Sequence, residues 1–274
     1  MLDIKLAMCN EFCEGWSFED ACALAADAGY EGIEIAPFTI KESVEEITQE
    51  EQERVRQIAG SEGLEVAGLH WLLASPEGLY LTHPDNEVRE WTQDYLRAEI
   101  DFCASIGGDR LILGSPDQRN VLEDDSYEAA WDRAVEVFSE LAPHAEERGV
   151  ILCIEPLAPA ETNFITSAAD ARRMVDAVDH PGFKMMLDVK AMCGDVEPIP
   201  DIIRKSAGYV EHFHANDESL GGPGSGQTDF EPIVQALDDI DYAGWVSVEV
   251  FDFSPGAEAI ARGSICYLQD VFQG

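Results

Sequence analysis

Basic residues are scarce in this chain. Its 274 residues include 17 Lys and Arg against 55 Asp and Glu, which gives a formal net charge of −38. A surface of that sign repels a phosphate backbone, so we expect no nucleic-acid partner. The acidic residues recur along expected helical faces, as at 42–46 and 50–53, rather than in one acidic tail. We interpret them as a solvated, halophilic surface whose self-repulsion is relieved by salt.

Long apolar runs are also missing. None approaches the roughly 18 residues of a membrane span. The N-terminus, residues 1–5, lacks the basic start and apolar stretch of a signal peptide. We therefore expect a cytoplasmic protein with no membrane partner. Hydrophobic residues still make up 46% of the chain, which is enough for a sizeable core.

The seven cysteines are scattered and form no C-x-x-C pair. This spacing argues against a disulfide framework and against a zinc finger. Cys153, within the apolar run 151–154, is instead typical of a small buried side chain.

Eight short apolar runs recur along the chain. They lie at residues 4–7, 32–35, 65–69, 110–113, 151–154, 184–187, 209–213 and 245–248. Their length and β-branched content are typical of buried parallel strands.

Helical patterns separate these runs. Ser17 opens a capping sequence for a helix that extends to residue 28 and ends at Gly29. Further helices are expected at 88–106, 127–148 and 167–178. This alternation predicts an α/β fold, a single (β/α)₈ TIM barrel that forms one domain over residues 1–274. The alternative, an open doubly wound sheet, is disfavoured because no G-x-G-x-x-G follows the first strand.

Polar residues stand at the carboxyl ends of four successive predicted strands, where a barrel gathers its catalytic groups. They are Glu155, Asp188, His214 and Glu249. Each carboxylate taken alone is as well explained by a helix cap or a salt bridge. Together, three carboxylates and one imidazole would repel one another without a cation. The set suits Mn²⁺, Mg²⁺ or Co²⁺ better than a thiol-seeking metal, so we expect one divalent ion.

Three further polar residues are candidates for contact with a substrate. Glu34 and His70 sit at the ends of the second and third predicted strands, and for Glu34 a salt bridge is the alternative. His212 shares a strand face with His214 because side chains alternate along a strand. One of these two histidines can be a hydrogen-bonded core residue, an interpretation that we favour for His212.

Aromatic residues near strand ends allow two interpretations. Trp16, Trp71 and Phe251 suit a wall on which a substrate stacks, and they equally suit a core or a dimer contact. The sequence therefore leaves a homo-oligomer open.

Together these residues resemble a known family. Residues 154–157 (Ile-Glu-Pro-Leu), 187–188 (Leu-Asp), 212–214 (His-Phe-His) and 248–250 (Val-Glu-Val) look like the xylose-isomerase-like TIM barrel superfamily. Within it, the chain is most similar to the sugar (phosphate) isomerase/epimerase group that includes ketose 3-epimerases. The resemblance covers nearly the whole chain, including residues 68–70 and 223–230.

The resemblance implies an enzyme that isomerises or epimerises a small carbohydrate, with one metal ion, commonly manganese. The family's four ligands fall on Glu155, Asp188, His214 and Glu249, and a substrate-contacting Glu falls on Glu161.

Two groups of the family pattern are missing. The His that often follows the Asp ligand by three residues is Ala191 here, and the Arg expected after the His ligand is absent from residues 216–220. Lys190 is a candidate to replace part of these groups and to bind substrate. The departures count against fructose or psicose as substrate and leave open a glycoside-derived 3-keto sugar, an inosose-like polyol or an acidic sugar.

The predicted site indicates a mechanism. The metal would polarise a substrate carbonyl and so ease removal of the neighbouring proton. Glu155 and Glu249 would act as the catalytic pair, one removing the proton and the other returning it to the opposite face of an enediolate.

Three alternatives differ in class. A metal-dependent lyase or dehydratase, acting on an inosose or a keto-glycoside, would begin with the same enolisation. Phosphodiester hydrolysis would need a His-rich metal cluster, whereas this acidic chain has six His in all. A non-catalytic sugar-binding barrel would not require the four ligands.

Overall fold

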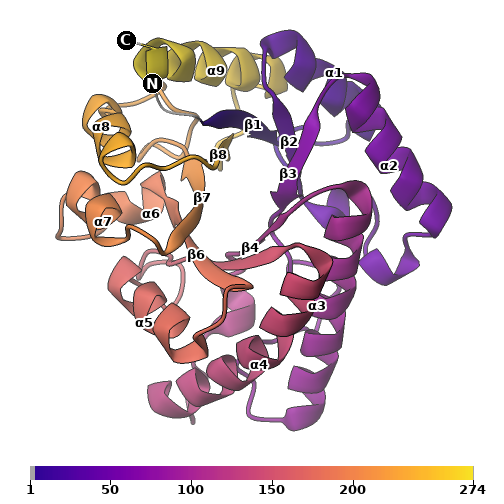
Figure 1. The fold of residues 1–274 in the computed structure, drawn as a ribbon, viewed down its shortest axis with the longest axis vertical. Helices are drawn as coiled ribbons and strands as arrows, with labels where there is room; N and C mark the ends of the chain where they lie inside the picture. Colours follow the sequence, from indigo (N-terminus) through magenta and orange to yellow (C-terminus); the bar gives the residue numbers. More distant parts are fainter. Residues whose placement is uncertain (1–3, 274) are drawn as a thin grey trace.

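A computed structural model describes residues 4–273 of the chain and shows a closed barrel of eight parallel strands (Figure 1). Residues 1–3, which belong to the N-terminal segment without signal-peptide features, lie outside that range. The strands are β1 (Lys5–Cys9), β2 (Gly32–Ile35), β3 (Glu65–Leu69), β4 (Arg110–Leu113), β5 (Ile151–Ile154), β6 (Phe183–Asp188), β7 (Val210–Ala215) and β8 (Trp245–Val248). Each pairs with the next, and β8 pairs with β1, which confirms the predicted (β/α)₈ barrel.

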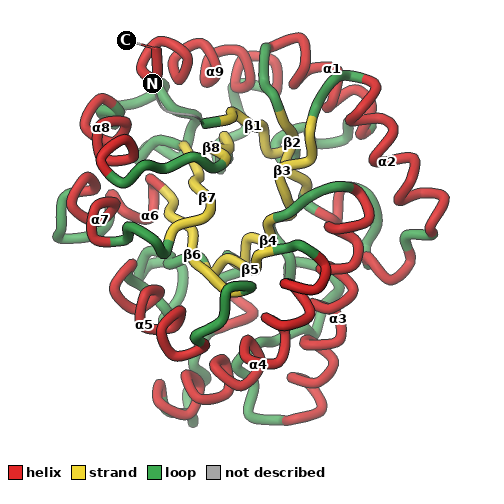
Figure 2. The backbone as a smooth tube through the Cα atoms, in the orientation of Figure 1, coloured by secondary structure: helices red, strands yellow, loops and turns green. Residues whose placement is uncertain are grey.

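Helices surround the barrel as an outer ring (Figures 1 and 2). They are α1 (Phe18–Ala28), α2 (Gln49–Ser61), α3 (Asn86–Ile106), α4 (Tyr127–Arg148), α5 (Ala168–Val178), α6 (Val189–Cys193), α7 (Ile199–Lys205), α8 (Glu231–Asp239) and α9 (Ala257–Gln273). Short 3₁₀ turns occupy Pro37–Thr39, Val44–Glu46 and Asp117–Arg119. No helix within residues 4–273 has the length and apolar character of a membrane span.

The predicted helix ends are set by local capping. The Ser17 side chain accepts a hydrogen bond from the Asp20 backbone N–H, and Gly29 ends the helix with a φ of 103°, a left-handed value that glycine adopts without strain. Helix α3 begins two residues before the predicted start because Asp85 caps it. Of residues 42–46, expected on a helical face, only Val44–Glu46 form a 3₁₀ turn, since the backbone becomes extended again at Ile47.

The barrel lining differs between the amino and the carboxyl ends of the strands. At the amino ends of the strands, the Trp245 ring packs with Ala7 and Ala67. Gly32 makes room for this ring, because a Cβ atom there would lie 2.7 Å from it. At the carboxyl ends the inward-facing side chains are carboxylates and imidazoles. The buried carboxylates and imidazoles of the barrel lining thus gather at one mouth of the barrel.

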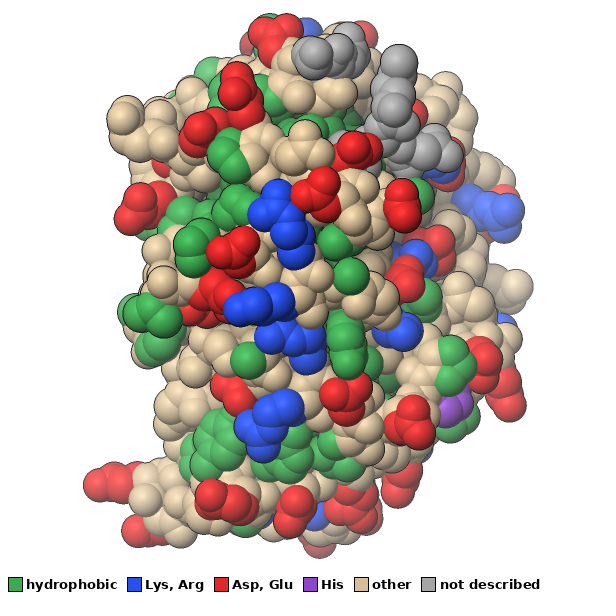
Figure 3. Space-filling model, turned by 60° about the vertical axis from the view of Figure 1, so that its left-hand side comes forward, with side chains coloured by type: hydrophobic (Ala, Val, Ile, Leu, Met, Phe, Trp, Pro, Cys, Tyr) green, Lys and Arg blue, Asp and Glu red, His purple; other side chains and the backbone are tan. Residues whose placement is uncertain are grey.

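Acidic side chains are spread over the face shown in Figure 3, with Lys and Arg side chains among them. The seven cysteines are unpaired, and Cys153 is buried as predicted.

Candidate metal centre and substrate cavity

The four predicted ligands meet at the carboxyl ends of adjacent strands. Glu155 and Glu249 directly follow β5 and β8, whereas Asp188 and His214 are inward-facing residues at the ends of β6 and β7. One donor atom from each lies within 4.8 Å of the other three, and all four residues are buried. Strands β6 and β7 extend one and two residues beyond their predicted ends, because Asp188 still pairs with His214 and Ala215 with Val248.

The charges of this cluster are poorly balanced by the protein alone. Burial, with the nearby charges of Glu249 and Asp188, raises the pKa of Glu155 well above its usual range. Burial and the charge of Glu249 also raise the pKa of Asp188, to about 6. Burial opposes ionisation of Glu249, but His214 outweighs it and lowers that pKa. Converging buried carboxylates of this kind fit a divalent cation, which would bind their charged forms.

A second layer of polar residues lies beneath the ligands. The Glu34 carboxylate lies 2.9 Å from His214 Nε2 and 2.7 Å from His212 Nε2. On the other edge of the His214 ring, Nδ1 lies 3.0 Å from Glu249 Oε2. This is the arrangement in which a carboxylate orients a metal-binding histidine through its far nitrogen. Although burial opposes ionisation, His212 and His214 hold the pKa of Glu34 well below its usual range.

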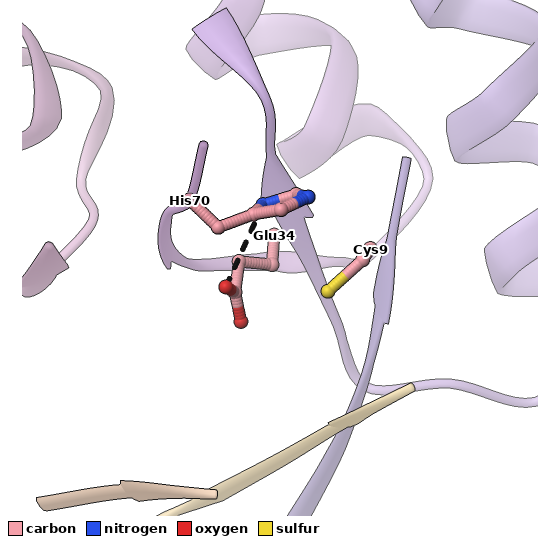
Figure 4. Close-up of side chains that lie close together, drawn as sticks. All are labelled: Cys9, Glu34 and His70. Atoms are coloured by element: carbon pink, nitrogen blue, oxygen red, sulfur yellow. Dashed lines mark ion pairs between the residues drawn. The ribbon is translucent and has the colours of Figure 1, made fainter. Parts of the chain in front are cut away.

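The layer continues to β1 and β3. Figure 4 shows the His70 ring above the Glu34 carboxylate, with the Cys9 sulfur directed toward that carboxylate. His70 Nδ1 lies 3.5 Å from Glu34 Oε1, and His70 Nε2 lies 3.0 Å from Glu11 Oε2. Cys9, Glu34 and His70 also have donor spacing that suits a metal. Because Glu34 already contacts three imidazoles, we interpret this layer as support for the upper cluster.

A cavity of about 100 Å³ opens above the cluster. Its lining residues are His70, Trp71, Gly114, Ser115, Pro116, Glu155, Leu157, Glu161, Lys190, Glu249 and Phe251. Glu155 and Glu249 thus belong both to the ligand cluster and to the cavity wall.

Lys190 is the cation of the cavity wall. Its Nζ lies 2.6 Å from Glu161 Oε1 and 3.6 Å from the centre of the Phe251 ring. Burial opposes its charge, but Asp188 and Glu161 together raise the pKa of Lys190. Helix α6 carries Lys190 two residues after Asp188, which places it at the edge of the ligand cluster.

Other groups hold the candidate ligands in place. The Asn216 side chain donates to Asp188 Oδ2 at 2.5 Å and accepts from the Lys190 backbone N–H at 2.7 Å. Arg119, fully buried, donates to the backbone oxygen of Glu155 at 2.7 Å.

The structure separates the predicted site residues into three groups. His70, Glu155, Glu161, Lys190 and Glu249 line the cavity. Glu34, Asp188, His212 and His214 lie beneath it and are fully buried. Trp16, 42% exposed, lies in the loop after β1 and is not among the cavity-lining residues.

Sequence reasoning missed Glu11 and Gly114. Glu11 follows β1 by two residues, so the rule that functional groups follow barrel strands would have found it. Gly114 directly follows β4 and has the same positional signal, but it carries no functional group. Because it has no side chain, it leaves room for the Glu155 carboxylate.

A closed parallel barrel with carboxylates and an imidazole at the carboxyl ends of its strands defines a TIM-barrel protein with a candidate divalent-metal centre. The chain belongs to the xylose isomerase-like TIM barrel family, whose model matches residues 22–271.

Sugar epimerases are prominent among the similar proteins. The chain is 24% identical to a probable ketose 3-epimerase of Synechocystis over 261 residues, covering 89% of this chain and 88% of that one. It is 36% identical to a D-psicose 3-epimerase of Ruminiclostridium cellulolyticum over 121 residues, covering 44% and 41%.

Solved structures share the fold. A crystal structure of D-psicose 3-epimerase in the presence of D-fructose superimposes with a TM-score of 0.87 at 23% identity, over 98% of this chain and 100% of that one. The 3-keto-D-glucoside 4-epimerase of E. coli gives a TM-score of 0.85 at 18% identity, over 97% and 99%.

Proposed function

We propose that this protein is a metal-dependent isomerase or epimerase of a small carbohydrate, acting by proton transfer next to a carbonyl. One observation carries the proposal: Glu155 and Glu249 contribute to both the four-residue ligand cluster and the cavity wall. The similarity to several sugar epimerases supports the same reaction class.

The residues that would hold the ion are Glu155, Asp188, His214 and Glu249. Oxygen donors with one imidazole favour Mn²⁺, with Mg²⁺ and Co²⁺ as alternatives. When bound, a divalent ion supplies positive charge that polarises a substrate carbonyl and stabilises negative charge on its oxygen.

The protein's own carboxylates would move the proton. Glu249, whose ionised form is favoured by His214, is suited to remove a proton from the carbon beside the carbonyl. Glu155, which lines the same cavity, would return one to the resulting enediolate. If the two carboxylates lie on opposite faces of that carbon, its configuration inverts. In the reverse reaction the roles exchange.

The charge of the cavity wall favours an unphosphorylated substrate. Three carboxylates, Glu155, Glu161 and Glu249, line the cavity together with Lys190, whose ammonium group is already paired with Glu161. A bound divalent ion would bring this set close to neutrality, without a free cation for a phosphate group. We propose that Glu161, Lys190 and His70 hydrogen-bond to the hydroxyl groups of a neutral sugar or keto-sugar.

The test is a substrate screen in D₂O, read by NMR. The metal-loaded protein is incubated with ketoses, keto-glycosides, inososes and the corresponding sugar phosphates. We expect conversion of an unphosphorylated compound with deuterium incorporated at the carbon next to the carbonyl. Loss of water or of a glycosidic group would identify the lyase instead. Conversion without solvent deuterium would contradict the proposed proton transfer.

The catalytic pair is tested with Glu155→Gln and Glu249→Gln. Each change keeps the side-chain size and one ligand oxygen but removes the proton acceptor. General acid–base groups contribute about 10²–10⁴-fold, so each variant should lose at least that much turnover. Bound metal is measured in each variant, because both residues are also proposed ligands. A metal-loaded variant that exchanges deuterium at the wild-type rate would remove that residue from the mechanism.

A further inference from the structure

Trp71 makes a direct contact with one of the two proposed catalytic carboxylates. It is the second residue after β3, and its indole Nε1–H donates to Glu249 Oε1 over 3.0 Å. Both residues line the cavity. The contact therefore lies on the substrate side of the ligand cluster.

The two oxygens of Glu249 consequently have different partners. Oε2 lies 3.0 Å from Nδ1 of the buried His214, while Oε1 is bound by Trp71. Among residues 4–273, no side chain donates a hydrogen bond to the Glu155 carboxylate. The protein thus holds one carboxylate at both oxygens and leaves the other without such a partner.

We infer that Trp71 is a positioning residue for Glu249, an inference that rests on the proposed function. Its indole directs Oε2 toward the ligand cluster and keeps Oε1 at the cavity wall. An indole N–H is a donor only, so Trp71 orients Oε1 without competing for the proton that Glu249 transfers. One lone pair of Oε1 stays free for that proton.

The backbone of Trp71 supports a specific role for this side chain. Its φ is +56°, in the left-handed region that bulky side chains rarely adopt. Such conformations persist where the surrounding structure holds them, often at functional sites. A ring that only lined the cavity would not require this strained backbone conformation, because a residue with negative φ can also place a ring in a cavity wall.

Glu11 contacts the two chain segments that carry Trp71 and Glu249. Its Oε2 contacts His70, the residue before Trp71, and its Oε1 accepts from the backbone N–H of Val250, the residue after Glu249. One buried carboxylate therefore fixes the segments that carry both ends of the Trp71–Glu249 hydrogen bond. Phe38 adds an edge-on ring contact to Trp71, with centroids 6.4 Å apart.

The first test observes the hydrogen bond without relying on activity. The chain has five Trp, so a ¹⁵N–¹H spectrum shows at most five indole signals, and Trp71→Phe identifies the one from Trp71. We expect that signal to exchange slowly with D₂O and to move upfield in Glu249→Ala. A Trp71 signal that is unchanged in Glu249→Ala would overturn the contact, whether or not the protein turns over a carbohydrate.

The second test separates positioning from substrate stacking. Trp71→Phe keeps an aromatic ring but removes the donor, and Trp131→Phe, in α4 beside Tyr127, is the matched control. Loss of a hydrogen bond to a charged group should lower kcat about 10- to 100-fold in Trp71→Phe, with KM within about threefold and bound metal unchanged. Trp131→Phe should retain wild-type kcat.

Several results overturn the inference. A raised KM with unchanged kcat would make Trp71 a stacking wall, and a kcat equal to that of Trp131→Phe would leave it no role in turnover. A Trp71→Phe protein that loses metal or unfolds is replaced by Trp71→Leu, which also lacks a donor and must show the same loss of kcat. If the wild type converts no carbohydrate, the proposed function fails, and the positioning role inferred for Trp71 fails with it. The ¹⁵N–¹H spectra then still show whether Trp71 and Glu249 are hydrogen-bonded.

Discussion

The Glu155 carboxylate occupies the space that a Cβ atom on Gly114 would take. Gly114 directly follows β4, so its bare backbone forms the wall against which the proposed catalytic carboxylate rests. Glycine is required here by close approach and not by an unusual φ.

Gly114→Ala should therefore displace Glu155 and impair catalysis. Misplacing a catalytic group by about 1 Å can cost on the order of 10²-fold in rate, and we expect a loss of that size in kcat. Gly60→Ala is the control, because a Cβ atom at position 60 meets no other atom within 4 Å. Steady-state kinetics and thermal melts of both variants check this. Wild-type kcat in Gly114→Ala would show that Glu155 can relocate freely.

Glu34→Gln should weaken metal binding without removing a ligand. The neutral amide attracts the His214 imidazole less strongly, and partners of this kind typically contribute about 10- to 100-fold in metal affinity. Calorimetric titration of the metal-free protein with Mn²⁺ measures the change in metal affinity. Glu99→Gln provides a matched control, since Glu99 is also fully buried but lies on α3. Equal affinities in the two variants would contradict the supporting role of Glu34.

Glu99→Met should stabilise the protein at high pH. Both Glu99 oxygens are buried without a hydrogen-bond partner, and burial raises the pKa of this carboxyl well above its usual range. The folded state thus holds a proton that the unfolded state releases above pH about 4.3, so stability falls as pH rises from there toward the folded pKa. Removing an unpartnered buried polar group should add about 1–3 kcal/mol at pH 8.

That gain should shrink as the pH falls to 4, where both states are largely protonated. Urea unfolding at several pH values, at one fixed high salt concentration, measures the difference between wild type and variant. Glu99→Gln keeps the shape and an amide but cannot titrate, so it should remove the pH dependence with a smaller gain. A stability difference that does not vary with pH would refute the assignment to Glu99.

Added salt should raise the thermal midpoint. The net charge of −38 destabilises the folded state through self-repulsion, which ions screen over about 10 Å at 0.1 M and about 3 Å at 1 M. Melts from low to molar KCl should show a rising midpoint. NaCl at equal ionic strength should act similarly if screening is the cause. A midpoint that is flat or falls with salt would argue against the halophilic interpretation.

Local sequence was sufficient for most of the fold. The apolar runs at 32–35, 110–113 and 151–154 match β2, β4 and β5 without change. Ser17 and Gly29 mark the ends of α1, because a hydroxyl that caps N–H groups and a glycine with positive φ act within a few residues. The four candidate ligands were also found from sequence, since the carboxyl ends of parallel strands meet at one mouth of a barrel.

Contacts between distant residues were decided by tertiary structure alone. Trp16 and Trp71 both stand near strand ends, and only the left-handed backbone at Trp71 directs its indole to Glu249, 178 residues away in sequence. Periodicity assigns a residue to an element and a face, but it does not report how a loop bends over the mouth. The same limit applies to Glu34, whose place beneath His214 follows from the register and curvature of the closed barrel.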